Sequence, residues 1–302
     1  MAARSTPPTP HLHWTDAERL DGLRSPILIA AFEGWNDAGE ASSTAARYVR
    51  DHFESVEVAT IDAEDFFDFT VARPSVRLDD DNRRHIVWPS TSVHVARLPG
   101  AGHDLVTMIG HEPQLRWRTF VDHVVATAEQ VGADLAITLG ALLTDVPHTR
   151  PVQVYGSSDD PELAAHLRLS PSDYEGPTGI VGVLGAGLRA AGMPTASLWA
   201  GVPAYVSSAP SPKAALALVE RLSAVFDAAI PCTDLEIASA AYERQVSDLV
   251  ADSDETAEYV ERLEADFDDD ADGHTDHDAD GEDPDRLVAD IEDFLRNHPG
   301  QA

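Results

Sequence analysis

The chain has 302 residues, of which 43% are hydrophobic and 25% are charged, and its formal net charge is −32 at pH 7. This apolar content suffices for one large globular core, and the negative charge argues against nucleic-acid or anionic-membrane partners. No apolar run approaches the roughly 20 residues that span a bilayer, and no secretory signal is recognisable. With Cys232 as the single cysteine, we expect a cytoplasmic protein without an intramolecular disulfide.

The first half of the chain alternates apolar runs with stripes of helical spacing. Residues 1–24 show no sustained periodicity, and we expect a flexible N-terminal arm there. Buried-strand candidates follow at 27–31, 57–61, 92–98 and 104–109, the last two as a hairpin. A helix is predicted between the first two of these strands from the stripe Ala45, Tyr48, Val49 and Phe53.

The same alternation continues to residue 231. The stripe from Trp117 to Ala128 predicts a helix, and apolar runs at 135–139 and 195–200 predict further strands. The glycine-rich segment after Pro177 is compatible with a helix or a strand, whereas Ser211 followed by Pro212 is typical of a helix start. We therefore expect residues 25–231 to form an α/β core, a three-layer sandwich with a mixed, largely parallel sheet.

Beyond residue 231 the pattern changes to helices only. Residues 232–267 predict a C-terminal helical hairpin, with stripes that include Tyr242, Leu249 and Phe267 and a capping box from Asp252 to Glu255. Residues 268–302 predict an acidic, disordered tail with a short terminal amphipathic helix.

Two motifs suggest a ligand but lack essential residues. Gly185, Gly187 and Ala190 match a dinucleotide-binding fingerprint, but no acidic residue follows the next strand, so close helix packing explains these glycines better. Asp276 and the acidic residues after it begin like an EF-hand loop, but the twelfth position is Leu287, which favours a solvated charge run. We expect no cofactor and no metal.

Polar residues follow several strands and define the candidate site. Because strand ends meet at one edge of an α/β sheet, these residues could form an acid/base group; they are Glu33, Asp37, Glu112, Arg116, Asp145 and His148. In the structural interpretation, Asp37 and Asp145 cap the segments after them and Arg116 pairs with a buried carboxylate. Spacing alone does not show convergence, so we favour the structural interpretation.

Five segments together resemble the proteasome assembly chaperone 2 family in its bacterial, actinobacterial form. They are FEGWNDAGEA from Phe32, GHEPQLRWRTFV from Gly110, LGALLTDVPHTRPV from Leu139, YEGPTGIVGVL from Tyr174 and ASLWAGVPAYVSSAPSPKAALAL from Ala196. These segments add Trp35, Trp117, Arg150, Glu175, Trp199 and Tyr205 to the candidate binding or structural-turn cluster. The final residues, NHPGQA, lack the hydrophobic-Tyr-any ending by which some members enter α-subunit pockets.

The resemblance implies an α/β core similar to nucleoside phosphorylases and peptidyl hydrolases, used for protein binding without an active site. It also implies self-association into a homo-oligomer, for example a trimer. The implied partners are proteasome subunits, which members of the family help to assemble without ATP. We therefore expect a non-enzymatic assembly-chaperone-like protein. The alternative is a small-ligand-binding protein or a hydrolase- or phosphorylase-like enzyme that uses the polar turns.

Overall fold

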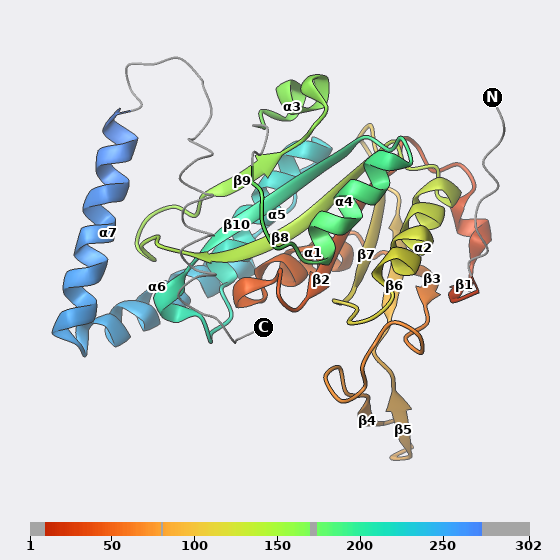
Figure 1. The fold of residues 1–302 in the computed structure, drawn as a ribbon, viewed down its shortest axis with the longest axis horizontal. Coiled ribbons are helices and arrows are strands. Elements are labelled where there is room, and N and C mark those ends of the chain that lie inside the picture. The colour runs from red at the N-terminus through yellow and green to blue at the C-terminus, as the bar shows by residue number, and fades with distance from the viewer. Residues whose placement is uncertain (1–9, 80, 170–173, 274–302) are drawn as a thin grey trace.

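One mixed sheet of eight strands organises the protein (Figure 1). The computed structural model describes residues 10–79, 81–169 and 174–273. The strand order is β1-β3-β6-β7-β2-β8-β10-β9. The four central strands, which are parallel, are β7 (Leu105–His111), β2 (Ile27–Glu33), β8 (Leu135–Thr144) and β10 (Thr195–Pro203). The outer strands, β1 (Leu12–Trp14), β3 (Val56–Ile61), β6 (Thr91–Ala96) and β9 (Val154–Ser157), are antiparallel to their neighbours.

Helices cover both faces of this sheet. Strand β2 is apolar along its length because alternate residues enter two different cores: Ile27 and Ile29 face one, Leu28 and Phe32 the other. Helices α1 (Ala41–His52) and α5 (Pro212–Phe226) pack on the first face, and α2 (Trp117–Gln130) and α4 (Ile180–Ala190) on the second. The predicted three-layer α/β sandwich is thus confirmed.

The structure tests the predicted start of helix α5, the segment after Pro177 and the role of Gly187. Helix α5 begins as expected, because the Ser211 hydroxyl accepts a hydrogen bond from the Ala214 N–H at 3.3 Å and Pro212 occupies the first turn. The segment after Pro177 forms the helix α4 and not a strand. A Cβ at Gly187 would lie 2.2 Å from Val121 Cγ1 of α2, so this glycine serves close helix packing and not a phosphate-binding turn.

The N-terminal residues correct one expectation. Within the segment expected to be a flexible arm, β1 pairs with β3, and the Arg24 guanidinium binds Asp104 at 2.7 Å. A three-residue strand is too short to show periodicity in sequence, although backbone pairing at a sheet edge holds it in place. The sequence also did not predict β9, the short helix α3 (Pro161–Leu167) or the two-stranded hairpin of β4 (Ser75–Leu78) and β5 (Arg84–Val87).

The C-terminal helices are longer than expected. Helix α6 spans Thr233–Ala251, and α7 spans Asp254–Gly273, so residues 268–273 are helical where a disordered tail was predicted. The α7 cap is Ser253, whose Oγ accepts from the Thr256 N–H, and not Asp252. Leu249, predicted in the packed stripe, is 65% exposed. The calcium-like motif and the expected terminal helix lie outside the described residues.

Among the described residues, no helix combines the length and apolar character that crossing a membrane requires.

Candidate functional site

The candidate residues gather along the carboxyl-terminal edge of the four parallel strands. Strand β2 ends at Glu33 and β7 at His111, and these two residues are register partners. Strands β8 and β10 end at Thr144 and Pro203, also register partners. The turns that follow these strands therefore emerge at the same edge of the sheet, where ligand sites of open α/β folds form. Their side chains nevertheless divide into separate groups.

Glu112 connects the β2 and β7 turns to helix α4. Its Oε1 accepts a hydrogen bond from the Ile180 N–H at 2.8 Å, and its Oε2 accepts one from the Trp35 N–H at 3.3 Å. Ile180 is the first residue of α4, so a carboxylate lies at the positive end of that helix. Gly34, with φ of 132°, lies so close that an added Cβ would be 3.1 Å from Glu112 Cβ. Glu112 thus serves as a helix cap supplied from a distant strand.

Glu33 is contacted by a guanidinium and an imidazole from neighbouring elements. One carboxylate oxygen contacts the Arg47 guanidinium of α1, and the other lies 2.6 Å from His111 Nδ1. Burial, and next the Arg47 charge, lower the pKa of His111, so this imidazole is neutral at pH 7. Sequence analysis did not select Arg47 or His111. His111 lies within the quoted segment beginning GHEP, directly before Glu112, which is the signal that could have found it.

Asp37 serves the helix that follows it. Its Oδ1 accepts hydrogen bonds from the Ser42 N–H at 2.8 Å, the Ser42 hydroxyl at 2.6 Å and the Ser43 N–H at 3.0 Å. These groups form the first turn of α1, whose N–H groups have no partners within the helix. The contacts agree with the structural interpretation of this residue.

A second group forms where β8 and β10 meet the C-terminal helices. The Tyr205 hydroxyl lies 2.8 Å from both the backbone N and Nδ1 of His148, and His148 Nε2 lies 3.0 Å from the Ser247 hydroxyl of α6. Lys213 donates to Glu243 of α6 at 2.8 Å. Burial and the Lys213 charge lower the pKa of His148, and burial raises the pKa of Tyr205. The imidazole therefore acts here as a neutral hydrogen-bonding link to α6.

Several polar contacts attach helix α7 to the same loop. The Tyr259 hydroxyl donates to Asp145 at 2.6 Å, so Asp145 binds a helix from the distant C-terminal region and does not cap its own turn. Arg150 binds both carboxylate oxygens of Asp268, at 2.8 and 2.6 Å. This bidentate contact raises the pKa of Arg150 and lowers that of Asp268.

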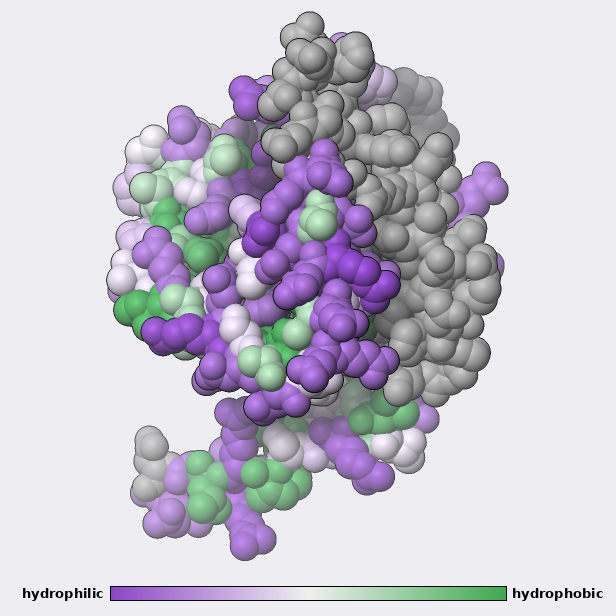
Figure 2. Space-filling model, turned by 90° about the vertical axis from the view of Figure 1, so that its left-hand side faces the viewer, coloured by the Kyte–Doolittle hydropathy of each residue, from purple (hydrophilic) through white to green (hydrophobic). Residues whose placement is uncertain are grey.

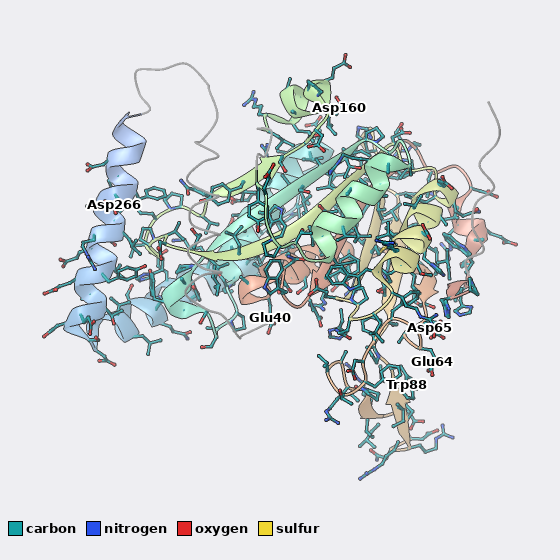
Figure 3. The ribbon with its side chains drawn as sticks, in the orientation of Figure 1. Glu40, Glu64, Asp65, Trp88, Asp160 and Asp266 are labelled. Carbon is teal, nitrogen blue, oxygen red and sulfur yellow. The ribbon has the colours of Figure 1, made fainter. Side chains whose placement is uncertain are left out.

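The remaining candidates make other contacts. Arg116 pairs with Asp65 (labelled in Figure 3), which is partly exposed and not buried as expected. Trp117 donates from its indole N–H to the Pro113 carbonyl. The Trp199 ring lies over Gly140 of the neighbouring strand, and Glu175 is exposed in the loop before α4.

These positions do not produce one shared cleft. A narrow crevice opens beside β8, and only two of the twelve candidates, His148 and Arg150, line it; its other lining residues are Val146, Pro147, Pro151, Val152, Gly201, Pro203, Ser211, Lys213 and Tyr242. Glu33 and Glu112 are absent from this lining. Within the described ranges, no group of three or more His, Cys, Asp or Glu residues could hold a metal ion. The arrangement positions helices and pairs charges, and Glu33 and His111 are the acid and base that lie together in it.

The chain is similar to known proteins in sequence and in fold. Residues 31–250 match the model of the PAC2 family. A PAC2 family protein from Streptomyces avermitilis is 46% identical, with a TM-score of 0.72, and the match covers 78% of this chain and 99% of that one. A proteasome-assembly chaperone homologue from Mycobacterium tuberculosis is 41% identical, with a TM-score of 0.70 and the same coverage of 78% and 99%.

A more distant similarity concerns the fold alone. An archaeal proteasome activator from Pyrococcus furiosus is 16% identical, with a TM-score of 0.62, and the match covers 76% of this chain and 94% of that one. The comparison with curated proteins gave no match.

Proposed function

Because the chain belongs to the PAC2 family, we propose that it is a non-enzymatic, ATP-independent protein of the proteasome-assembly-chaperone type. In this proposal it acts in the cytoplasm, associates with copies of itself and binds protein subunits. The subunits are those of a proteasome or a related assembly. The similarity to the Mycobacterium tuberculosis homologue, which extends over 99% of that chain, supports this choice of partner class.

One structural observation carries the non-enzymatic part of the proposal. The polar side chains at the sheet edge are used to hold helices: Glu112 caps α4, Asp37 caps α1, and His148 links the β8 turn to α6. An acid/base site needs such groups to converge within hydrogen-bonding reach of one reacting molecule. Here they stabilise a rigid platform whose outer surface remains for contacts with other proteins.

Crosslinking in cells tests the partner. The chain is expressed with an affinity tag, crosslinked, and its partners are identified by mass spectrometry, with an unrelated acidic protein of similar size as the control. We expect crosslinks to α-type proteasome subunits or their precursors, formed equally after ATP depletion. Their absence, with crosslinks to small-molecule enzymes only, would contradict the proposal.

The alternative function rests on the pair formed by Glu33 and His111. A carboxylate 2.6 Å from a neutral imidazole, at the end of two parallel strands, is an arrangement that can accept a proton from a ligand. A thermal-shift screen of metabolites tests it: a hit that disappears in His111→Asn but persists in His103→Asn would favour ligand binding at this pair. Under the proposed function neither variant changes the screen.

A further inference from the structure

The β4–β5 hairpin stands away from the sheet and exposes an apolar face. Within the described residues, β4 and β5 pair only with each other (Figure 1). Val76 lies opposite Ile86, and Leu78 lies opposite Arg84, so these four side chains share one face of the ribbon. The apolar members are 52–59% exposed, at Val76 56%, Leu78 59% and Ile86 52%.

Such a face requires an explanation. A two-stranded hairpin is marginally stable alone in water, and grouped apolar side chains on a protein surface mark interaction sites. Trp88, directly after β5, is 53% exposed and packs edge to face against Phe69 at 4.8 Å between ring centroids. Hydrophobic side chains are visible on this protrusion at the bottom of Figure 2. The exposed face therefore extends from the hairpin to its base.

The hairpin does not share the strong negative charge of the whole chain, which is −32, because its three arginines offset its three aspartates between Ser75 and Val87. The arginines are Arg77, Arg83 and Arg84, and Arg73 adds a fourth just before β4. Arg83 pairs with Asp79 and Asp81. The other three arginines make no ion pair with any described residue. The hairpin thus offers an apolar face with unpaired positive charge beside it.

A complementary surface lies on the C-terminal helices. The outer face of α7 has exposed carboxylates at helical spacing, with Asp254, Glu258 and Glu261 among them. The exposed apolar side chain of Leu249 lies at the end of α6, just before α7. In Figure 3, Asp266 on α7 lies at the left end of the molecule, whereas Trp88 lies in the protrusion at the lower right that carries the hairpin. The two surfaces therefore cannot meet within one copy.

We propose that the β4–β5 hairpin of one copy docks on the outer face of α6 and α7 of a second copy. This inference rests on the self-association in the proposed function and names its surfaces. The contact joins two different surfaces, so its repetition closes a ring where the rotation between neighbouring copies divides a full turn. A twofold hairpin-to-hairpin contact is disfavoured, because Arg84 lies on the apolar face and would approach its own copy.

Sedimentation of the full-length chain at several concentrations tests the apolar half of the contact. In Leu78→Thr/Ile86→Thr we expect dissociation to monomers or at least about a tenfold weaker association constant. Both residues are exposed, so thermal unfolding should be unchanged. The control is Val56→Thr, at an apolar position on β3 that is 39% exposed and should associate like the wild type.

Charge reversal tests the polar half and the pairing of the two surfaces. Arg84→Glu and Glu258→Arg should each weaken the association, and the variant with both changes should regain it. Hairpin variants that associate like the wild type would overturn this inference while leaving self-association intact. A wild-type chain that is monomeric at every concentration would overturn both the docking inference and the proposed self-association. Binding of other subunits is tested separately, by the crosslinking experiment.

Discussion

Glu112 and Ile180 are 68 residues apart in sequence, yet Oε1 of Glu112 accepts a 2.8 Å hydrogen bond from the Ile180 N–H. The carboxylate satisfies a backbone donor that has no partner within α4 and lies at the positive end of that helix. The second oxygen fixes the β2 turn through the Trp35 N–H. This residue couples the sheet edge to a helix, and its contribution can be measured.

Glu112→Ala should lower the free energy of unfolding by about 0.5–2 kcal/mol, the range measured for lost helix caps. Urea denaturation at pH 7 is the measurement. The control is Glu175→Ala, since Glu175 is an exposed acid in the loop before the same helix. Equal unfolding midpoints for the two variants would show that the cap does not stabilise the fold.

Gly140→Ala should destabilise the sheet because the new Cβ would lie 2.4 Å from Cε3 of the Trp199 ring. Overpacking of this kind costs about 1–3 kcal/mol, and displacement of Trp199 should also shift the tryptophan fluorescence. At Gly102 an added Cβ meets nothing within 4 Å, so Gly102→Ala is the matched control. A variant at 140 that unfolds and fluoresces like the control would contradict this packing.

Tyr259→Phe should loosen α7 without unfolding the core, because it removes the 2.6 Å hydrogen bond to Asp145. A hydrogen bond contributes about 1 kcal/mol, so amide hydrogens of α7 should exchange roughly fivefold faster. Hydrogen exchange read by mass spectrometry measures this. In Asp266→Asn, at another exposed position of the same helix, exchange should not change; faster exchange there too would indicate a general weakness of α7.

Stability should fall as the pH is lowered from about 6.5 to 4, and His94 is one cause. Burial, together with the Arg50 charge, lowers the pKa of His94 from 6.5 to about 4. In this pH range the unfolded chain binds a proton that the folded chain does not, so acid favours unfolding. Urea titrations at pH 7.5 and 4.5 should show a smaller loss in His94→Gln than in the wild type. An equal loss in both would exclude His94 as a contributor.

The sequence was sufficient for the central sheet, because strands buried on both faces form continuous apolar runs, as β2 shows from Ile27 to Phe32. It was not sufficient for the hairpin. The turn between β4 and β5 is charged, and the apolar residues of the two strands are exposed and not packed in a core. The end of α7 was also missed, because an acidic sequence gives no apolar stripe even where Arg150 binds Asp268.

For the candidate site, the sequence indicated which residues follow the strands but not what they contact. Asp145 and His148 are both near the end of β8, yet their partners are Tyr259 and Ser247, more than ninety residues later. We did not predict His111, because the acid/base interpretation used His148, which lies in the turn after β8. Pairings of this kind depend on how distant helices return to the sheet, and residue spacing does not contain that information.

The most direct test of the account is the assembly of purified proteasome α-type subunits from the same organism, followed over time by native mass spectrometry without ATP. We expect a complex between this chain and α-type subunits, and faster appearance of assembled rings when the chain is present than when an equal amount of an unrelated acidic protein is added. Assembly at the same rate with and without the chain, with no such complex detected, would contradict it.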